Sequence, residues 1–323
     1  MRKRRLGGTD VHLTTVGLGT WAIGGSGWSG GWGMQNDEES IAAIQRAIDL
    51  GVNWIDTAPA YGLGHSEEVV GQAIKGRRDQ VLVATKCGNV WNKGDNKLIK
   101  RLTADSIRQE IEDSLRRLDI DVIDLYQIHW PIPDEDIEEA WAEIGRAVEQ
   151  GKVRYAGVCN FSVEQLDRIR PIHPVASLQP PYSMLRRDVE EDILPYCAQR
   201  GIGVVCYSPM QAGLLTGKFT REWAAALKAD DWRSRSRDFQ DPELSANLAL
   251  VDGLRPIAEA RGCSLAQLAI AWVLRRPEVT SAIAGARRPS QIEETAGAMD
   301  VVLSDDEIAG IDALLEVRSH TSI

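Results

Sequence analysis

Residues 51–74 have the sequence Gly51-Val-Asn-Trp-Ile-Asp56-Thr-Ala-Pro-Ala-Tyr61-Gly-Leu-Gly-His-Ser-Glu-Glu-Val-Val-Gly-Gln-Ala-Ile74. The apolar residues at 52–55 predict a short buried strand, the Pro- and Gly-rich run 57–64 predicts a loop, and apolar residues at helical spacing over 67–74 predict a helix. Asp56 would end the strand and Tyr61 would lie in the loop behind it. Enzymes with parallel sheets keep their chemistry at this edge, although a capping Asp and a packed Tyr would give the same pattern.

The same alternation of strand and helix continues outward from this segment in both directions. Strands are predicted at 15–18, 52–56, 80–86, 122–128, 153–158, 176–179, 203–207 and 279–284. Helices are predicted at 37–50, 66–75, 103–118, 136–150, 162–170, 189–200, 247–261, 264–275 and 289–298. Gly51, Gly151, Gly201 and Gly262 each follow a helix, where a left-handed residue is favoured.

Eight strand–helix units without a composition break predict a single α/β domain over 1–323, folded as a (β/α)8 TIM barrel. Residues 3–6 and 11–13 flank Gly7-Gly8 and predict a short β-hairpin within residues 1–14. A doubly wound open sheet is the alternative. It is disfavoured because Gly17-Leu-Gly19-Thr-Trp-Ala22 fits the dinucleotide fingerprint only formally, with no helix predicted to start there.

Composition excludes several classes of function. The net charge of −10 argues against nucleic acid or an anionic membrane as a partner, and no window approaches the length of an apolar membrane span. Five cysteines without a C-x-x-C pair predict free thiols in a reducing cytoplasm, and no signal peptide is found. The histidines lack metal-ligand spacing, so no metal is expected; they are His12, His65, His129, His173 and His320.

Two long connections, 21–35 and 210–245, are rich in tryptophan. Loops of this length in a compact domain are usually functional. With Trp91 and Trp130, which fall at strand ends, several of these indoles are predicted to form an apolar funnel for a substrate, as opposed to a plug in the barrel mouth.

Lys86 and His129 end predicted strands, as Asp56 does, so a barrel would bring them together with Tyr61 at one face. This set suits the reduction of a carbonyl. Tyr61 can give a proton to the developing alkoxide, Lys86 would lower the pKa of that phenol, Asp56 can hold Lys86, and His129 can donate to the carbonyl oxygen. None of these side chains can carry a hydride, so a cofactor is required.

The last predicted strand is followed by Arg287-Arg288-Pro289 and a helix. A helix N-terminus with adjacent arginines predicts a phosphate site, in the place where barrels usually bind phosphate.

The sequence resembles the aldo-keto reductase superfamily over almost its whole length. It is most similar to bacterial members related to the channel β-subunit-like and general-stress branch. The motifs are Asp56-Thr-Ala-Pro-Ala-Tyr61-Gly with Glu67-Glu-Val-Val-Gly71, Ala84-Thr-Lys86, Tyr126-Gln-Ile-His129, Gly157-Val-Cys-Asn-Phe-Ser162 and Tyr207-Ser-Pro. The resemblance implies a barrel and reversible hydride transfer between a nicotinamide cofactor and a carbonyl compound. It implies that Asp56, Tyr61, Lys86 and His129 are catalytic.

Carried over by position, the resemblance assigns cofactor contacts to Gly19, Thr20, Trp21, Asp56, Cys159, Asn160, Gln179, Tyr207, Ser208, Met210, Gly213, Leu215, Lys218, Gly285, Ala286, Arg287, Gln291, Glu294 and Thr295. It assigns substrate contacts to Trp21, Tyr61, Trp91, His129 and Trp130. Residues 210–245 would cover the cofactor. The sequence departs from the family pattern with Thr295 in place of Asn, Gly285 in place of a basic residue, and Cys159 in place of Ser. Arg287 and Arg288 favour NADP(H) over NAD(H).

The expected function is NADPH-dependent reduction of an aldehyde or ketone, with a small-molecule carbonyl substrate. Alternatives are an NAD(P)-dependent dehydrogenase that oxidises a sugar or similar alcohol, a barrel enzyme that forms a Schiff base on Lys86, and a non-catalytic nucleotide-binding regulator. The sequence leaves open the physiological substrate, the direction of the reaction and the possibility of a homo-oligomer.

Overall fold

The computed structural model describes residues 1–92, 94 and 97–321. Eight parallel strands close into a barrel in the order β3-β4-β5-β8-β9-β10-β11-β12, and β12 pairs with β3. The strands are β3 (Val16–Gly19), β4 (Trp54–Asp56), β5 (Leu82–Cys87), β8 (Ile123–Ile128), β9 (Val153–Cys159), β10 (Ser177–Gln179), β11 (Gly203–Cys206) and β12 (Val279–Gly285). The predicted (β/α)8 barrel is confirmed, and the open sheet is excluded because the sheet has no edge.

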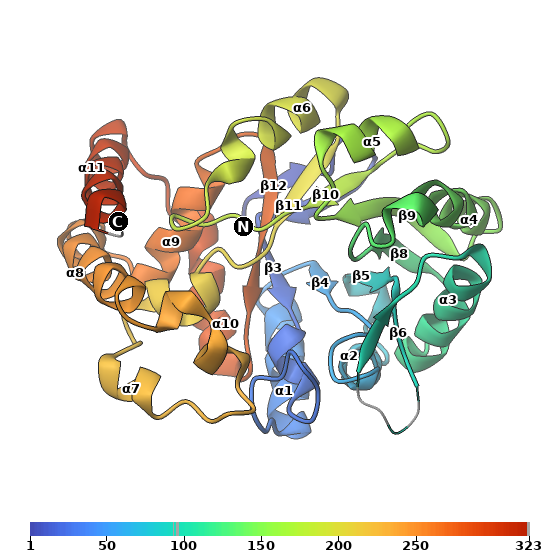
Figure 1. Ribbon diagram of the computed structural model, residues 1–323, viewed down its shortest axis with the longest axis horizontal. Coiled ribbons are helices and arrows are strands. Elements are labelled where there is room, and N and C mark those ends of the chain that lie inside the picture. Colours follow the sequence, from blue (N-terminus) through green and yellow to red (C-terminus); the bar gives the residue numbers. More distant parts are fainter. Residues whose placement is uncertain (93, 95–96, 322–323) are drawn as a thin grey trace.

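Helices surround the barrel, as Figure 1 shows. They are α1 (Asp37–Asp49), α2 (His65–Ile74), α3 (Ala104–Leu118), α4 (Ile137–Glu149), α5 (Val163–Ile169), α6 (Ile193–Arg200), α8 (Glu243–Arg261), α9 (Leu265–Leu274) and α10 (Pro289–Ala296). Local signals set their ends: Ser162 and Ser264 form capping boxes at the starts of α5 and α9. Gly201 and Gly262 end α6 and α8 in the left-handed conformation, as the sequence predicts.

The predicted N-terminal hairpin is present and consists of β1 (Lys3–Arg5) and β2 (His12–Thr14), paired antiparallel. It closes the amino end of the barrel. Leu6, Val11 and Leu13 pack against residues of the barrel strands in one apolar cluster. The cluster comprises Leu6, Val11, Leu13, Trp54, Ala84, Leu125, Val205 and Ile283. Ile283 lies toward the carboxyl end of β12, and we call the other seven residues the base plug.

Several elements depart from the sequence prediction. A second hairpin, β6 (Asn89–Trp91) with β7 (Leu98–Lys100), follows β5 and was not predicted. The C-terminal helix α11 (Asp305–Thr321) was also not predicted; it packs against α8, beside which it lies in Figure 1. The expected loop 210–245 contains the short helix α7 (Arg221–Ala225) and several 3-10 turns, and α8 begins within its last residues.

Within the described residues, no single helix is long and apolar enough to cross a membrane. The bent pair α8 and α9 meets that length and composition together, with an angle of 86° between them. Nine of the ten residues of α9 are buried in the core of the protein, which accounts for the apolar character of this helix.

Candidate active site

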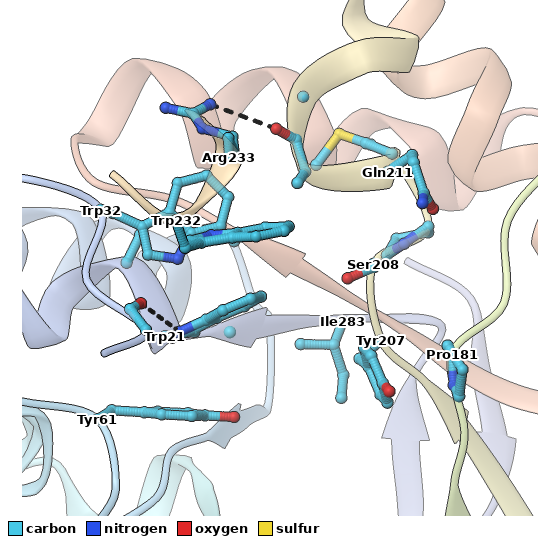
Figure 2. Close-up of a pocket in the computed structure, with 18 of the residues that line it drawn as sticks. Trp21, Trp32, Tyr61, Pro181, Tyr207, Ser208, Gln211, Trp232, Arg233 and Ile283 are labelled. Atoms are coloured by element: carbon cyan, nitrogen blue, oxygen red, sulfur yellow. Dashed lines mark hydrogen bonds between the residues drawn. The ribbon is translucent and has the colours of Figure 1, made fainter. Parts of the chain in front are cut away.

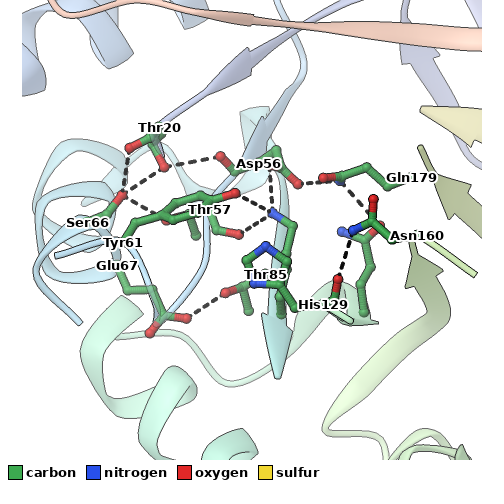
Figure 3. Close-up of polar contacts among 12 residues, drawn as sticks. Thr20, Asp56, Thr57, Tyr61, Ser66, Glu67, Thr85, His129, Asn160 and Gln179 are labelled. Atoms are coloured by element: carbon green, nitrogen blue, oxygen red, sulfur yellow. Dashed lines mark hydrogen bonds and ion pairs between the residues drawn. The ribbon is translucent and has the colours of Figure 1, made fainter. Parts of the chain in front are cut away.

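Three neighbouring strands bring the expected catalytic residues together at the carboxyl end of the barrel. Asp56 ends β4, Lys86 lies near the end of β5, and His129 directly follows β8. The Lys86 ammonium donates to Asp56 Oδ2 at 2.7 Å, to the carbonyl oxygen of Thr57 at 2.9 Å and to the Tyr61 hydroxyl at 3.3 Å. Figure 3 shows Asp56, Thr57 and Tyr61 converging on this point, with His129 beside them. The structure therefore places these four side chains as the sequence predicts.

The carboxylate of Asp56 is held from both sides. Its Oδ2 accepts from Lys86, and its Oδ1 accepts from the side-chain amide of Gln179 at 2.8 Å. Asp56 is 3% exposed and Lys86 is 1% exposed, so this ion pair is shielded from water. A buried pair with further hydrogen bonds on both partners has a fixed geometry, which a catalytic group needs.

The loop that carries Tyr61 is anchored through hydroxyl and carboxylate contacts. Ser66 donates to the Thr20 hydroxyl at 2.8 Å and lies 3.0 Å from the Thr57 hydroxyl. Glu67 accepts from the Thr85 hydroxyl at 2.6 Å, as Figure 3 shows. Glu67 also pairs with Arg117 at 2.6 Å. The motif residues Thr57 and Glu67, together with Ser66, therefore anchor the loop that carries Tyr61.

The electrostatics of the site differ from the sequence expectation in one respect. Burial raises the pKa of Tyr61 to about 12, and the opposing effect of the Lys86 ammonium is smaller. The expectation that Lys86 lowers this pKa below its ordinary value is therefore wrong for the protein alone, because desolvation of the phenol outweighs the ammonium. A phenol with this pKa is fully protonated at neutral pH and can act as an acid toward a more basic alkoxide.

The two basic groups are also perturbed. Burial acts to lower the pKa of Lys86, but the charge of Asp56 raises it above its ordinary value. Burial lowers the pKa of His129 well below its ordinary value, and the charges of Lys86 and Lys100 lower it further. At neutral pH Lys86 is therefore charged and His129 is neutral. A lysine that forms a Schiff base needs a neutral amine, so the state of Lys86 disfavours the Schiff-base alternative.

A cavity of about 670 Å³ opens above Tyr61 and His129. Its wall includes a stack of aromatic rings: Trp21 lies 6.5 Å from Tyr61 and 5.2 Å from Trp232, measured between ring centroids. Figure 2 shows Trp21, Trp32 and Trp232 together on one side, with Tyr207, Ser208 and Pro181 across from them. The tryptophans that line the cavity are Trp21, Trp28, Trp32, Trp130, Trp223 and Trp232. The predicted aromatic funnel is present.

The two long connections meet over this cavity. Trp32 forms an isolated antiparallel bridge with Asp231, and the guanidinium of Arg233 lies 4.6 Å from the centroid of the Trp32 ring. Arg233 is buried and pairs with Asp231 at 2.6 Å. The first and seventh barrel loops are therefore joined into one wall.

At the far end of the cavity, the strand β12 leads into helix α10. No side chain caps the N-terminus of α10, and its N-cap residue Arg288 is exposed. Arg287 instead holds the first loop: it donates to Gln35 Oε1 at 2.5 Å and to the carbonyl oxygens of Trp32 and Met34. Lys218 pairs with Glu294 at 2.5 Å. An uncapped helix N-terminus beside an exposed arginine fits a phosphate group.

The residues near Asp56 fit the nicotinamide end of a dinucleotide. Asn160 has a left-handed backbone, with φ 62°, and its side chain accepts from the Tyr207 hydroxyl at 2.9 Å. Its amide donates to the backbone oxygen of His129 at 3.0 Å. Gln179 lines the cavity, and its side-chain oxygen accepts no hydrogen bond from the described residues, so it can accept from a carboxamide. The donor set suits a nicotinamide cofactor.

Most of the residues assigned by resemblance line the cavity. They are Gly19, Trp21, Asp56, Tyr61, His129, Trp130, Asn160, Gln179, Tyr207, Ser208, Met210, Gly213, Lys218, Gly285, Arg287, Gln291, Glu294 and Thr295.

Five of the residues assigned to cofactor or substrate contacts do not line the cavity. Thr20 is fully buried, and its hydroxyl donates to the backbone of Asp56 at 3.1 Å. Leu215 and Ala286 belong to the hydrophobic core, and Cys159 is 1% exposed. Trp91, expected to face the substrate, lies in β6 with its ring 5.9 Å from the Arg117 guanidinium. Strand and loop positions in the sequence could not show which way these side chains point.

Several polar residues of the cavity were missed by the sequence analysis, and Asn89 and Lys100 are the two beside His129. Asn89 and Lys100 lie opposite each other in the hairpin β6–β7, and both line the cavity beside His129. Their short, half-buried strands lack a clear alternation of apolar and polar residues, so no sequence signal pointed to them.

Metal and thiol chemistry have no structural support in the described part of the chain. It contains no group of three or more His, Cys, Asp or Glu residues placed to hold a metal ion; the side chain of His320 lies outside it. The five cysteines are free, as predicted. Burial raises the pKa of Cys87, Cys197 and Cys206, which makes these thiols unreactive.

Known proteins resemble this chain along nearly its whole length. The model of the Aldo/keto reductase family matches residues 15–316. Aldo-keto reductase YhdN of Bacillus subtilis is 41% identical over 311 residues, which cover 95% of this chain and 92% of the relative. The NADH-specific methylglyoxal reductase of Escherichia coli is 37% identical over 318 residues, which cover 94% of this chain and 95% of the relative.

Among solved structures, a glycerol dehydrogenase from Gluconobacter oxydans superposes with a TM-score of 0.89 at 41% identity. The match covers 98% of this chain and 95% of that chain.

Proposed function

This chain belongs to the aldo/keto reductase family, which makes it an NAD(P)H-dependent oxidoreductase, and we propose that it reduces aldehydes and ketones to alcohols with NADPH. Tyr61 is the proposed proton donor. The observation that carries this proposal is the contact of the Lys86 ammonium with both Asp56, at 2.7 Å, and Tyr61, at 3.3 Å, beside a cavity of about 670 Å³.

Each residue has a distinct part in the proposed reaction. The Tyr61 hydroxyl gives its proton to the oxygen of the carbonyl group as that oxygen becomes an alkoxide. The Lys86 ammonium, held by Asp56, stabilises the phenolate left on Tyr61. His129 donates a hydrogen bond that orients the carbonyl oxygen. A bound nicotinamide supplies the hydride that no side chain here can carry.

The preference for NADP(H) is supported by Arg288. This guanidinium is exposed at the uncapped N-terminus of α10 and forms no ion pair with the described residues. Arg287 contributes less to phosphate binding than the sequence suggests, because its hydrogen bonds hold residues 32–35. Glu294 opposes the preference, since a carboxylate suits the ribose hydroxyl of NAD(H). Its ion pair with Lys218 reduces that effect.

Oxidation of an alcohol with NADP+ is the second candidate, since the residues can run the same steps in reverse. The relatives named above act on methylglyoxal and on glycerol, both small oxygenated three-carbon molecules. We propose substrates of similar size, because Trp21 and Trp232 restrict the space above Tyr61. The free cysteines support a reducing, cytoplasmic location.

The test is a panel of substrates with both cofactors. Purified protein is expected to quench NADPH fluorescence and to oxidise NADPH in the presence of methylglyoxal or a simple aromatic aldehyde. The reverse reaction is assayed with glycerol and aldoses and NADP+. Cofactor binding without turnover on any member of the panel would contradict the proposal and favour a nucleotide-binding regulator.

A further inference from the structure

The hairpin β6–β7 places a polar pair against the catalytic histidine. Asn89 and Lys100 are cross-strand partners, and Asn89 is 2% exposed. The start of the hairpin is fixed to the barrel, because the backbone N–H of Gly88 donates to Glu110 Oε2 at 2.8 Å. Asn89 is therefore a fixed group between Lys100 and His129.

The ammonium of Lys100 determines which way the amide of Asn89 faces. Lys100 Nζ lies 2.7 Å from Asn89 Oδ1. An ammonium can only donate hydrogen bonds, so the atom next to it must be the amide oxygen. The Asn89 nitrogen then faces the other way, where it lies 3.0 Å from His129 Nδ1.

The amide in turn determines which nitrogen of His129 carries the proton. An amide NH2 group can only donate, so His129 Nδ1 must accept and carries no proton. The proton of the neutral imidazole is therefore on Nε2. With the opposite tautomer, Nε2 would present a lone pair to the cavity and would repel a carbonyl oxygen.

Apart from Asn89, no residue that the structure describes forms a hydrogen bond with the imidazole of His129. Its ring meets Tyr61 edge to face at 5.8 Å between centroids and stacks on Trp130 at 6.2 Å. Burial, and then the charges of Lys86 and Lys100, disfavour a second proton on the ring and lower the pKa of His129. Lys100 is itself placed 5.1 Å from the centroid of Trp130, which helps to fix the ammonium over Asn89.

We propose that Lys100 and Asn89 are positioning residues that hold His129 as the Nε2–H tautomer, so that Nε2 donates to the carbonyl oxygen of the substrate. The tautomer follows from the hydrogen bonds alone. Its consequence for catalysis rests on the proposed function.

The first test is the tautomer itself, measured by NMR of the whole protein with 15N-labelled histidine, with His129→Gln used to assign the signal. The parent protein is expected to show an unprotonated Nδ1 and a protonated Nε2 at neutral pH. A protonated Nδ1, or equal amounts of the two tautomers, would overturn the proposal, and this readout does not depend on activity.

The second test uses Asn89→Leu, which removes the donor, and Asn89→Asp, which replaces it with an acceptor. Asn89→Leu is expected to give mixed tautomers and to lower kcat for aldehyde reduction about tenfold, with unchanged cofactor affinity. Asn89→Asp is expected to move the proton to Nδ1. Asn92→Leu, at an exposed asparagine of the same hairpin, is the matched control and is expected to change neither measurement.

The outcomes separate the two proposals. If the parent shows the Nε2–H tautomer and Asn89→Leu abolishes it, the positioning role stands even where the protein reduces no aldehyde, and only the proposed function fails. If Asn89→Leu keeps a pure Nε2–H tautomer and full kcat, the positioning role is wrong.

Discussion

The two ends of the barrel are built from the same strands but have opposite character. Trp54, Ala84, Leu125 and Val205 belong to the apolar base plug. Each of these residues is followed, two positions later in the chain, by a residue that lines or supports the active-site mouth. These four residues are Asp56, Lys86, Gln127 and Tyr207. Successive side chains of a strand alternate between its faces, so each pair shares the inner face of the barrel.

The free space at the two ends also differs. The mouth contains a cavity of about 670 Å³, whereas the pocket at the base measures about 20 Å³. Close packing at the base stabilises the fold, while the mouth holds buried charges that need fixed partners. The comparison therefore predicts that substitutions at the mouth change activity, and that substitutions at the base change stability.

The largest expected effect is at Tyr61. Tyr61→Phe removes the proposed proton donor and should lower kcat by roughly 10³-fold, with little change in thermal stability or NADPH affinity. Steady-state kinetics and a fluorescence titration measure these quantities. Tyr155→Phe, at a tyrosine that contacts Asp10 near the other end of the barrel, is the matched control. A Tyr61→Phe protein as fast as the parent would refute the assigned role.

Leu125→Ala tests the base. Leu125 is 5% exposed within the base plug, so truncation leaves a cavity and should lower the free energy of unfolding by about 3 kcal/mol. Urea unfolding measures the loss. The kcat of the folded protein should stay within a factor of about two, since the substitution is remote from the mouth. A large fall in kcat without a loss of stability would contradict the proposal that residues at the base affect stability and not activity.

The buried carboxyl of Glu110, near the mouth, makes the stability of the protein depend on pH. Burial raises the pKa of Glu110 to about 7, against the opposing hydrogen bonds of Gly88 and Ser106. The folded protein therefore holds a proton that the unfolded chain releases near pH 4.5. Protonation of Glu110 therefore makes the free energy of unfolding roughly 3 kcal/mol larger below about pH 4.5 than at high pH. This difference is lost as the pH rises through 7.

Glu110→Gln keeps a neutral side chain at every pH. The variant should show a smaller fall in the free energy of unfolding between pH 5 and pH 8 than the parent. Denaturant unfolding at both pH values provides the comparison. Glu68→Gln, at an exposed glutamate, should follow the parent. Equal pH dependence in the Glu110→Gln protein and the parent would show that this carboxyl is not perturbed.

The smallest expected effect concerns the rim of the mouth. Arg288→Ala should weaken NADPH binding about tenfold through loss of a charge-assisted hydrogen bond and leave NADH binding unchanged. Arg287→Ala should weaken both cofactors together, because it releases residues 32–35. Fluorescence titrations with the two nucleotides distinguish these results. A selective loss of NADPH affinity in Arg287→Ala would reverse the assignment of the two arginines.

Sequence patterns predicted the barrel strands because each strand has an apolar run bounded by helix signals. They placed Asp56, Lys86 and His129 in the site because each of these residues ends such a run. They missed α11, whose apolar and polar residues do not separate into clear faces, and the hairpin β6–β7. They also assigned Trp91 to the substrate site, whereas its ring packs near Arg117. The assignment failed because the chain after β5 forms a hairpin that was not predicted, and this hairpin sets the direction of the Trp91 side chain.

The sequence by itself determined the order of the elements and the chemical types gathered at the barrel mouth, because strand periodicity and helix caps are local properties of the chain. Only the tertiary structure decided how those groups are protonated and paired. Burial sets the raised pKa of Tyr61, and Arg287 bonds to a loop about 250 residues away in the chain. Desolvation and long-range hydrogen bonds depend on which segments pack together, and that is not encoded in any one stretch of residues.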